Sequence, residues 1–293
     1  MALAYKEVRE MVINVLSGKG GTGKTTVSTA LAYVLRKRGL TVQLLDADVE
    51  EPNDHIFFDI DFEKERSVDI LLPVVDKERC TLCGECGKVC QFGAIVVFPT
   101  TVMVFDYLCH GCGACSMVCP EKAISEKPKS IGKISFGKTS EGIFFGMGLL
   151  NIGEPSGVKI IRELKKGMRN DVEVTIIDSP PGTSCPVVES LRKSDFAVLV
   201  TESTPFGLHD LRMALRVVDG MGIRRGVVIN RYDPDFKEME EFLQEKGIEI
   251  LMKIPFDREI ASHYSKGRLF VKHMESWKEK FWQMYQRIKE MIA

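Results

Sequence analysis

The sequence has no apolar run of the roughly 18 residues that a membrane-spanning helix needs, and residues 1–10 contain no apolar core of a signal peptide. It also has no excess of either charge, since 40 Lys and Arg residues stand against 41 Asp and Glu residues. These absences predict a cytoplasmic chain without a membrane span. They also disfavour a globally basic nucleic-acid-binding protein, so no nucleic-acid partner is expected.

The composition is otherwise that of a globular protein, apart from its cysteines. Hydrophobic residues make up 44% and charged residues 28% of the 293 residues, which excludes disordered, collagen-like and coiled-coil chains. The length favours about two domains. Eight of the nine cysteines lie between Cys80 and Cys119, and the ninth is Cys185. In a reducing compartment such a cluster indicates metal ligation before disulfides.

Strand and helix patterns alternate along both ends of the chain. The predicted strands are Met11–Ser17, Thr41–Leu45, Val172–Ile177, Phe196–Val200, Gly226–Ile229 and Ile248–Ile254. The predicted helices are 25–38, 155–168, 185–194, 207–220, 235–246 and 276–292. This alternation predicts an α/β fold, a mostly parallel sheet with helices on both faces. Residues 76–130 interrupt it, so we expect an inserted domain there, between the first part (1–75) and the second part (131–293) of the main domain. The glycine-rich stretch 131–148 is expected to form a hairpin that leads back to the main domain.

A phosphate-binding loop follows the first strand. Residues 18–25, GKGGTGKT, fit the pattern G-x-x-x-x-G-K-[ST], whose backbone N–H groups cradle phosphate oxygens. The predicted nucleotide-binding residues of this segment are Gly18, Gly20, Gly21, Thr22, Gly23, Lys24, Thr25 and Thr26. Lys24 is expected on the β- and γ-phosphates of ATP and Thr25 on Mg²⁺. The alternative is a tight turn with an incidental lysine.

The second lysine of this loop, Lys19, makes it resemble the deviant Walker A motif of the MinD/ParA/Mrp (SIMIBI) ATPases and the nitrogenase iron protein. The resemblance implies an ATP-dependent homodimer in which Lys19 reaches the partner's phosphates. It also implies that Asp46 and Asp178 serve Mg²⁺ and that Asp48 aligns the attacking water. Asn230 and Pro255 match positions beside the adenine, although a capping role for Asn230 is the alternative.

The cysteines form two runs with the spacing of bacterial ferredoxins, C-x₂-C-x₂-C-x₃-C, repeated at an offset of 29 residues. In such runs the fourth cysteine ligates the other cluster. We therefore expect two 4Fe–4S clusters, one held by Cys80, Cys83, Cys86 and Cys119 and one by Cys109, Cys112, Cys115 and Cys90. Gln91 follows Cys90 where the second run has Pro120. Zinc, or clusters that only stabilise a small module, are the alternatives.

The two features together resemble P-loop ATPases of the MinD superfamily that contain an inserted ferredoxin domain. The resemblance implies an ATPase that couples ATP-dependent switching to electron transfer, or to delivery of an iron–sulfur cluster or metallocofactor to an unidentified partner protein. The alternative is a MinD/ParA-like spatial regulator or a redox-sensing switch. A Mrp-type bridging cluster would need a C-x-x-C in the C-terminal third, which is absent. Two features have competing interpretations: Cys185 is either buried or redox-active, and the C-terminal helix packs on the core or contacts a membrane.

Overall fold

The computed structural model describes residues 11–293, so the segment in which the sequence predicts no signal core lies outside it. Within the described residues, one sheet has the strand order β11-β10-β9-β1-β8-β2-β7-β6-β3. Its strands are β1 (Met11–Leu16), β2 (Val42–Asp46), β3 (Ile60–Val75), β6 (Ile124–Thr139), β7 (Phe144–Leu150), β8 (Val174–Asp178), β9 (Phe196–Glu202), β10 (Arg224–Tyr232) and β11 (Ile250–Pro255). The strands from β11 to β7 pair in parallel, and β6 and β3 add two antiparallel pairings at one edge.

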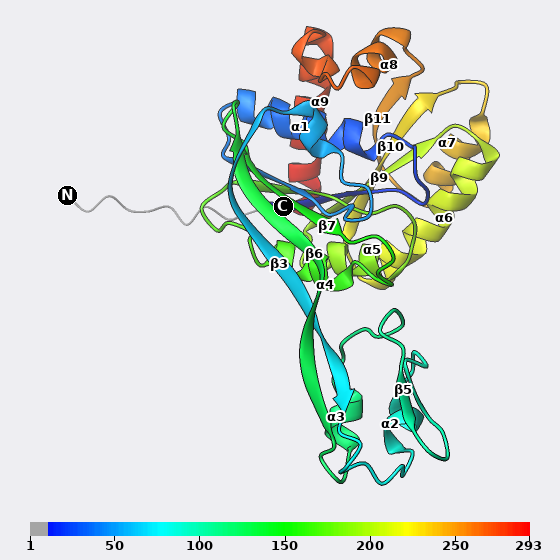
Figure 1. Cartoon of the computed structure of the whole chain (residues 1–293). Helices are drawn as coiled ribbons and strands as arrows, with labels where there is room; N and C mark the ends of the chain where they lie inside the picture. Colours follow the sequence, from blue (N-terminus) through cyan, green and yellow to red (C-terminus); the bar gives the residue numbers. More distant parts are fainter. Residues whose placement is uncertain (1–10) are drawn as a thin grey trace.

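Helices cover both faces of this sheet (Figure 1). One face is covered by α1 (Lys24–Lys37), α8 (Arg258–Ser265) and α9 (Glu275–Ile292), with the short 3₁₀ helices η1 (Asp54–Phe57) and η2 (Phe270–Lys272). The other face is covered by α4 (Val158–Lys165), α5 (Cys185–Leu191), α6 (Pro205–Gly220) and α7 (Lys237–Glu245). Successive strand residues alternate between the two cores: Ile13 and Val15 pack towards α1, whereas Val12 packs towards α4. The predicted mostly parallel α/β architecture is confirmed.

The C-terminal helix α9 packs on the body of the protein. Trp277, Phe281 and Ile288 on its apolar stripe are buried, in the same core cluster as the inner face of α1. This arrangement agrees with core packing, the first of the two interpretations of this helix. None of the helices in residues 11–293 is long and apolar enough to cross a membrane.

A two-stranded stalk extends from the sheet edge and carries a small module at its tip (Figure 1). Strands β3 and β6 are 16 residues each and pair antiparallel from Ile60 opposite Thr139 to Val75 opposite Ile124. The sequence did not predict strand β3. It predicted the β6–β7 hairpin from residue 131, whereas β6 begins earlier, at Ile124. Because residues 132–138 of β6 also pair with β7 in the body, only the other half of the ribbon projects as the stalk; it comprises residues 68–75 and 124–131 and joins residues 76–123 to the body.

The module at the tip consists of two similar halves. It contains α2 (Glu85–Val89), α3 (Ala114–Val118) and a small antiparallel pair, β4 (Ile95–Val97) and β5 (Val102–Val104). Its left-handed backbone positions recur at the sequence offset of the cysteine runs: Leu82 with Gly111, Gly84 with Gly113, and Gly93 with Lys122. The two halves thus share backbone conformation as well as cysteine spacing, which supports the internal repeat seen in the sequence.

Candidate functional site

The glycine-rich loop lies between β1 and α1, and close packing requires glycine at two of its positions. A Cβ on Gly18 would lie 2.3 Å from the carbonyl oxygen of Asp210 in α6. Gly23 has a φ of 95°, and a Cβ there would lie 2.4 Å from the side-chain nitrogen of Asn230. That Asn230 amide donates a 2.8 Å hydrogen bond to the carbonyl oxygen of Thr22. Asn230, at the end of β10, therefore holds the loop in place and does not cap a helix.

The loop opens into a cleft of about 700 Å³ at the carboxyl ends of the parallel strands. Ligands bind at this edge in open α/β sheets. The predicted residues that line the cleft are Gly20, Gly21, Gly23, Lys24, Thr25, Thr26, Asp48, Asn230 and Pro255. Five others do not line it: Gly18 and Thr22 are packed behind the loop, Asp46 and Asp178 are buried beneath it, and Lys19 pairs with Glu202.

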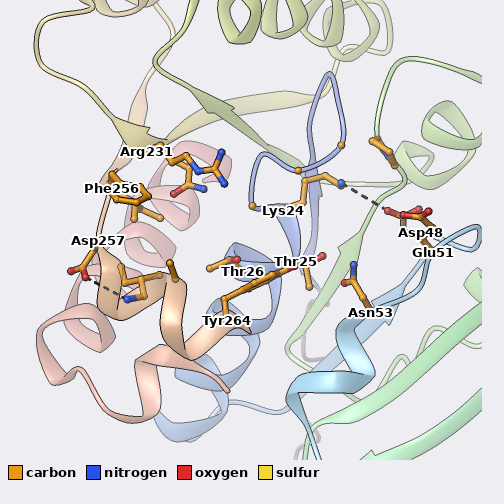
Figure 2. Close-up of a pocket in the computed structure, with 18 of the residues that line it drawn as sticks. Lys24, Thr25, Thr26, Asp48, Glu51, Asn53, Arg231, Phe256, Asp257 and Tyr264 are labelled. Atoms are coloured by element: carbon orange, nitrogen blue, oxygen red, sulfur yellow. Dashed lines mark hydrogen bonds and ion pairs between the residues drawn. The ribbon is translucent and has the colours of Figure 1, made fainter. Parts of the chain in front are cut away.

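The cleft also contains residues that the sequence did not predict as site residues (Figure 2). Phe256 and Arg231 lie on the side of Lys24 away from Asp48 and Asn53, and Tyr264 from α8 forms part of the floor. The Tyr264 ring lies 5.2 Å from the ring of Phe57 in η1. Phe256 follows Pro255 directly and is 66% exposed, which is unusual for a large apolar side chain. Residues 258–265, which form α8, carry no motif, so no sequence signal pointed to Tyr264.

Buried carboxylates lie beneath the phosphate loop. The hydroxyl of Thr25 donates a 2.8 Å hydrogen bond to Asp178, at the end of β8. Asp46, at the end of β2, accepts the backbone N–H groups of Asp48 (3.2 Å), Asn53 (2.9 Å) and Asp54 (3.0 Å). Carboxylate and hydroxyl oxygens are the ligands that Mg²⁺ prefers, so Thr25, Asp46 and Asp178 could hold this ion. Asp54 packs against the same group and was not predicted, because it belongs to no motif.

Burial dominates the electrostatics of these acids. It raises the pKa of Asp48 to about 7, although the ammonium of Lys24, 3.9 Å from the Asp48 carboxylate, opposes the shift. Burial also raises the pKa of Asp178, again against the effect of Lys24. The pKa of Asp46 is raised well above its usual value, first by burial and then by the nearby Asp178. Lys24 is therefore the cation that Asp48 and Asp178 share.

Lys19 points away from the other loop lysine. Its ammonium lies 3.5 Å from Glu202, which ends β9. Glu202 is nearly buried and also accepts a 2.8 Å hydrogen bond from Arg231. In this structure the predicted in-trans lysine is thus paired within its own chain.

The eight clustered cysteines line two small cavities in the module. One cavity is lined by Cys80, Cys83, Cys86 and Cys119, and the other by Cys109, Cys112, Cys115 and Cys90. Each cavity thus takes three cysteines from one run and the fourth from the other run. All eight are free thiols, as is Cys185, which is exposed at the start of α5 and lines neither cavity. The interpretation of Cys185 as a buried cysteine is therefore wrong.

The backbone around the fourth cysteines is arranged identically in the two halves. The N–H of Ala94 donates to the sulfur of Cys90 and the N–H of Ala123 to the sulfur of Cys119, both at 3.3 Å. Such N–H···S contacts stabilise a thiolate. Burial, in contrast, raises the pKa of Cys86, Cys109 and Cys115. Each cavity is thus lined by four cysteines, one of which receives a backbone N–H, and this is a donor set that could hold an iron–sulfur cluster.

Comparison with known proteins gives three findings. The family model described as the CobQ/CobB/MinD/ParA nucleotide binding domain matches residues 13–270. An uncharacterized protein of Methanocaldococcus jannaschii is 34% identical over 90% of this chain and 92% of its own length. The cytosolic Fe-S cluster assembly factor NUBP2 of Gallus gallus is 27% identical over 89% of this chain and 84% of its own.

Among solved structures, the septum site-determining protein MinD of Pyrococcus horikoshii, complexed with Mg-ADP, is similar in fold. The two superpose with a TM-score of 0.58 over 97% of this chain and 98% of that one, at 18% identity.

Proposed function

Since the chain belongs to the CobQ/CobB/MinD/ParA nucleotide-binding family, we propose that it is an ATPase whose nucleotide-driven switching acts on a cysteine module holding two 4Fe–4S clusters. The observation that carries this proposal is the division of the eight cysteines into two cavities, each with three sulfurs from one run and one from the other. In ferredoxins with this spacing, each cluster likewise takes three cysteines from one run and the fourth from the other run. The module stands on a stalk whose first strand begins a few residues after the nucleotide cleft.

In the nucleotide cleft, the loop amides and Lys24 would bind the phosphates. The oxygens of Thr25, Asp46 and Asp178 would hold Mg²⁺, which when bound neutralises phosphate charge during phosphoryl transfer. Asp48 would align the attacking water, and its contact with Lys24 keeps it beside the phosphate position. The adenine would lie near Asn230 and Pro255, where the exposed ring of Phe256 offers a stacking surface.

Dimerisation would change the environment of Lys19. In a nucleotide-bound homodimer, Lys19 would leave Glu202 and contact the phosphates of the partner subunit. Arg231 remains hydrogen-bonded to Glu202 in its absence, so the carboxylate would not be left unpaired. Because Arg231 stays paired with Glu202, moving Lys19 away costs less free energy than breaking an isolated buried ion pair would.

In the module, the eight cysteines would hold the clusters, which when bound accept and donate single electrons. The N–H groups of Ala94 and Ala123 would orient and tune the sulfurs of Cys90 and Cys119. Two complete four-cysteine cavities favour electron transfer to a partner protein. Delivery of a cluster or metallocofactor to an assembly partner is the second candidate, and the similarity to the cytosolic Fe-S cluster assembly factor favours it.

The test is the ATPase rate of anaerobically reconstituted protein before and after chemical reduction. We expect the rate to change on reduction, and a double variant, Cys83→Ser with Cys112→Ser, controls for direct effects of the reductant. An identical rate in both redox states would leave the module uncoupled from the ATPase. Failure to hydrolyse ATP at all would refute the proposed activity itself.

A further inference from the structure

Asp54 is a buried acid that the proposed chemistry does not use. It is the first residue of η1, and no part of it is exposed to solvent. Among residues 11–293, no N–H or O–H group donates to either of its carboxylate oxygens, and the neighbouring polar side chain is the carboxylate of Asp178. A buried, ionised carboxylate without a partner lowers the stability of the folded protein unless it binds a proton or a cation.

The surroundings of Asp54 offer other oxygens at metal-binding spacing. Carboxylate oxygens of Asp46, Asp54 and Asp178 lie within 4.8 Å of one another. Backbone N–H groups and the Thr25 hydroxyl occupy Asp46 and one oxygen of Asp178, whereas the second oxygen of Asp178 is also unpartnered. The unfilled oxygens of this group therefore belong to Asp54 and Asp178, the two residues that face each other.

The charges of this group do not balance within the described residues. The ammonium of Lys24 acts on Asp48 and Asp178, whereas the charges that act on Asp46 and Asp54 are those of the neighbouring carboxylates. A divalent cation coordinated by oxygen would supply the missing positive charge, and an all-oxygen set suits Mg²⁺ or Mn²⁺.

We propose that Asp54 is a further ligand of the divalent cation in the nucleotide site, and that cation binding through Asp54 fixes the start of β3, the strand that continues into the stalk. The inference rests on the proposed function in taking this cleft as the cation–nucleotide site. It adds a ligand from outside the phosphate loop and the two aspartate motifs.

The chain between Asp54 and the start of β3 is short and well anchored. Phe57 and Phe58 are buried in the core below α1, and β3 begins at Ile60. The carbonyl of Asp59 accepts the N–H of Ser140, and Ile60 pairs with Thr139 at the end of β6. A displacement of Asp54 on cation binding would therefore be passed through η1 to the first residues of β3, and β3 continues into the stalk.

The first measurement is a titration of the reconstituted full chain with Mn²⁺. The electron paramagnetic resonance signal of free Mn²⁺ reports how much of the ion stays unbound at each step. Asp54→Asn preserves shape and can donate a hydrogen bond to Asp178, so the fold is retained. We expect this variant to bind Mn²⁺ at least about tenfold more weakly. Asp59→Asn, on the same segment but exposed, is the matched control and should bind like the wild type. Unchanged affinity in Asp54→Asn would overturn the ligand assignment and make Asp54 a protonated structural donor.

The second measurement is hydrogen exchange of peptides covering residues 54–62, with and without saturating Mn²⁺. We expect Mn²⁺ to protect this segment in the wild type and in Asp59→Asn, and to protect it less in Asp54→Asn. Equal protection at equal saturation would overturn the link to the stalk. ATP turnover of the wild type is scored separately, because a chain that binds Mn²⁺ through Asp54 yet hydrolyses no ATP refutes the proposed ATPase and not this inference.

Discussion

The ammonium of Lys19 lies 3.5 Å from one carboxylate oxygen of Glu202, while the other oxygen of Glu202 accepts a hydrogen bond from Arg231. Lys19 is 38% exposed and Glu202 is nearly buried, so the lysine is the mobile member of this contact. The proposed dimer thus requires the exchange of one ion pair for another, and the lysine side chain alone has to move.

Lys19→Ala should prevent ATP-induced dimers, because the proposed contact with the partner's phosphates is lost. Light scattering of the hydrolysis-arrested protein with ATP measures the mass directly. Lys237→Ala, an exposed lysine on α7, is the control and should dimerise normally. Dimers that form equally well without Lys19 would contradict its role in trans.

Lys24→Ala should reduce ATP turnover by at least about 100-fold, because it removes the charge that stabilises the transferring phosphate. The iron content of the variant should stay that of the wild type, since the module lies at the far end of the stalk. Steady-state phosphate release and iron analysis measure the two quantities. Lys266→Ala, exposed just after α8, serves as the control. Turnover near the wild-type rate in Lys24→Ala would refute the assignment of the phosphate loop.

Cys119→Ser should remove the same cluster as Cys80→Ser, although Cys119 belongs to the other run in the sequence. The reason is that Cys119 lines the cavity of Cys80, Cys83 and Cys86. Iron should fall from about eight to about four per chain in both variants, and the electron paramagnetic resonance signal of the reduced protein should be the same in both. Cys185→Ser should keep all its iron. A Cys119→Ser signal that matches Cys112→Ser instead would reverse the ligand pairing.

Ionisation of Asp48 should make nucleotide-free protein less stable as the pH rises. Its pKa is raised from 3.8 to about 7 in the folded protein, so the folded state binds more protons than the unfolded state between about pH 4 and 7. The free energy of unfolding therefore falls through this window and levels off above it. Asp48→Asn removes this contribution.

Thermal unfolding of the two proteins from about pH 5.5 to about pH 8 measures the effect. The unfolding temperature of Asp48→Asn minus that of the wild type should increase by a few degrees as the pH rises over this range. A difference that is constant with pH would show that Asp48 titrates as an ordinary exposed carboxyl.

The sequence predicted the parts of the fold whose physical signal is local. All six predicted strands and six predicted helices are present, with ends within three residues of those expected. The alternation of Val68, Ile70 and Leu72 could have identified the outer half of β3, because these residues are buried in a core cluster that includes residues of both the body and the module. The inner half could not be predicted, because Glu63, Lys64 and neighbouring residues are exposed on both faces and have no hydrophobic period.

The residues of the candidate site also fall into those that the sequence could predict and those that it could not. Motif residues such as Lys24, Thr25 and Asp178 could be predicted because their spacing fixes where they lie at the ends of strands. Asp54 and Tyr264 could not, because they reach the cleft only through the packing of η1 and α8 onto the body. The partner of Lys19 was likewise not predictable, since Glu202 lies about 180 residues away in the sequence and follows a strand without a motif.

The stalk leaves the body and returns to it on neighbouring strands, where Val68 lies opposite Gly132. The projecting half of the ribbon, about eight residues of each strand, spans about 25 Å, and any two-residue lengthening of both strands would preserve which side chains face inward. The reach of the module can therefore vary between homologous chains without altering the body, and the module can be exchanged as a cassette at a single junction.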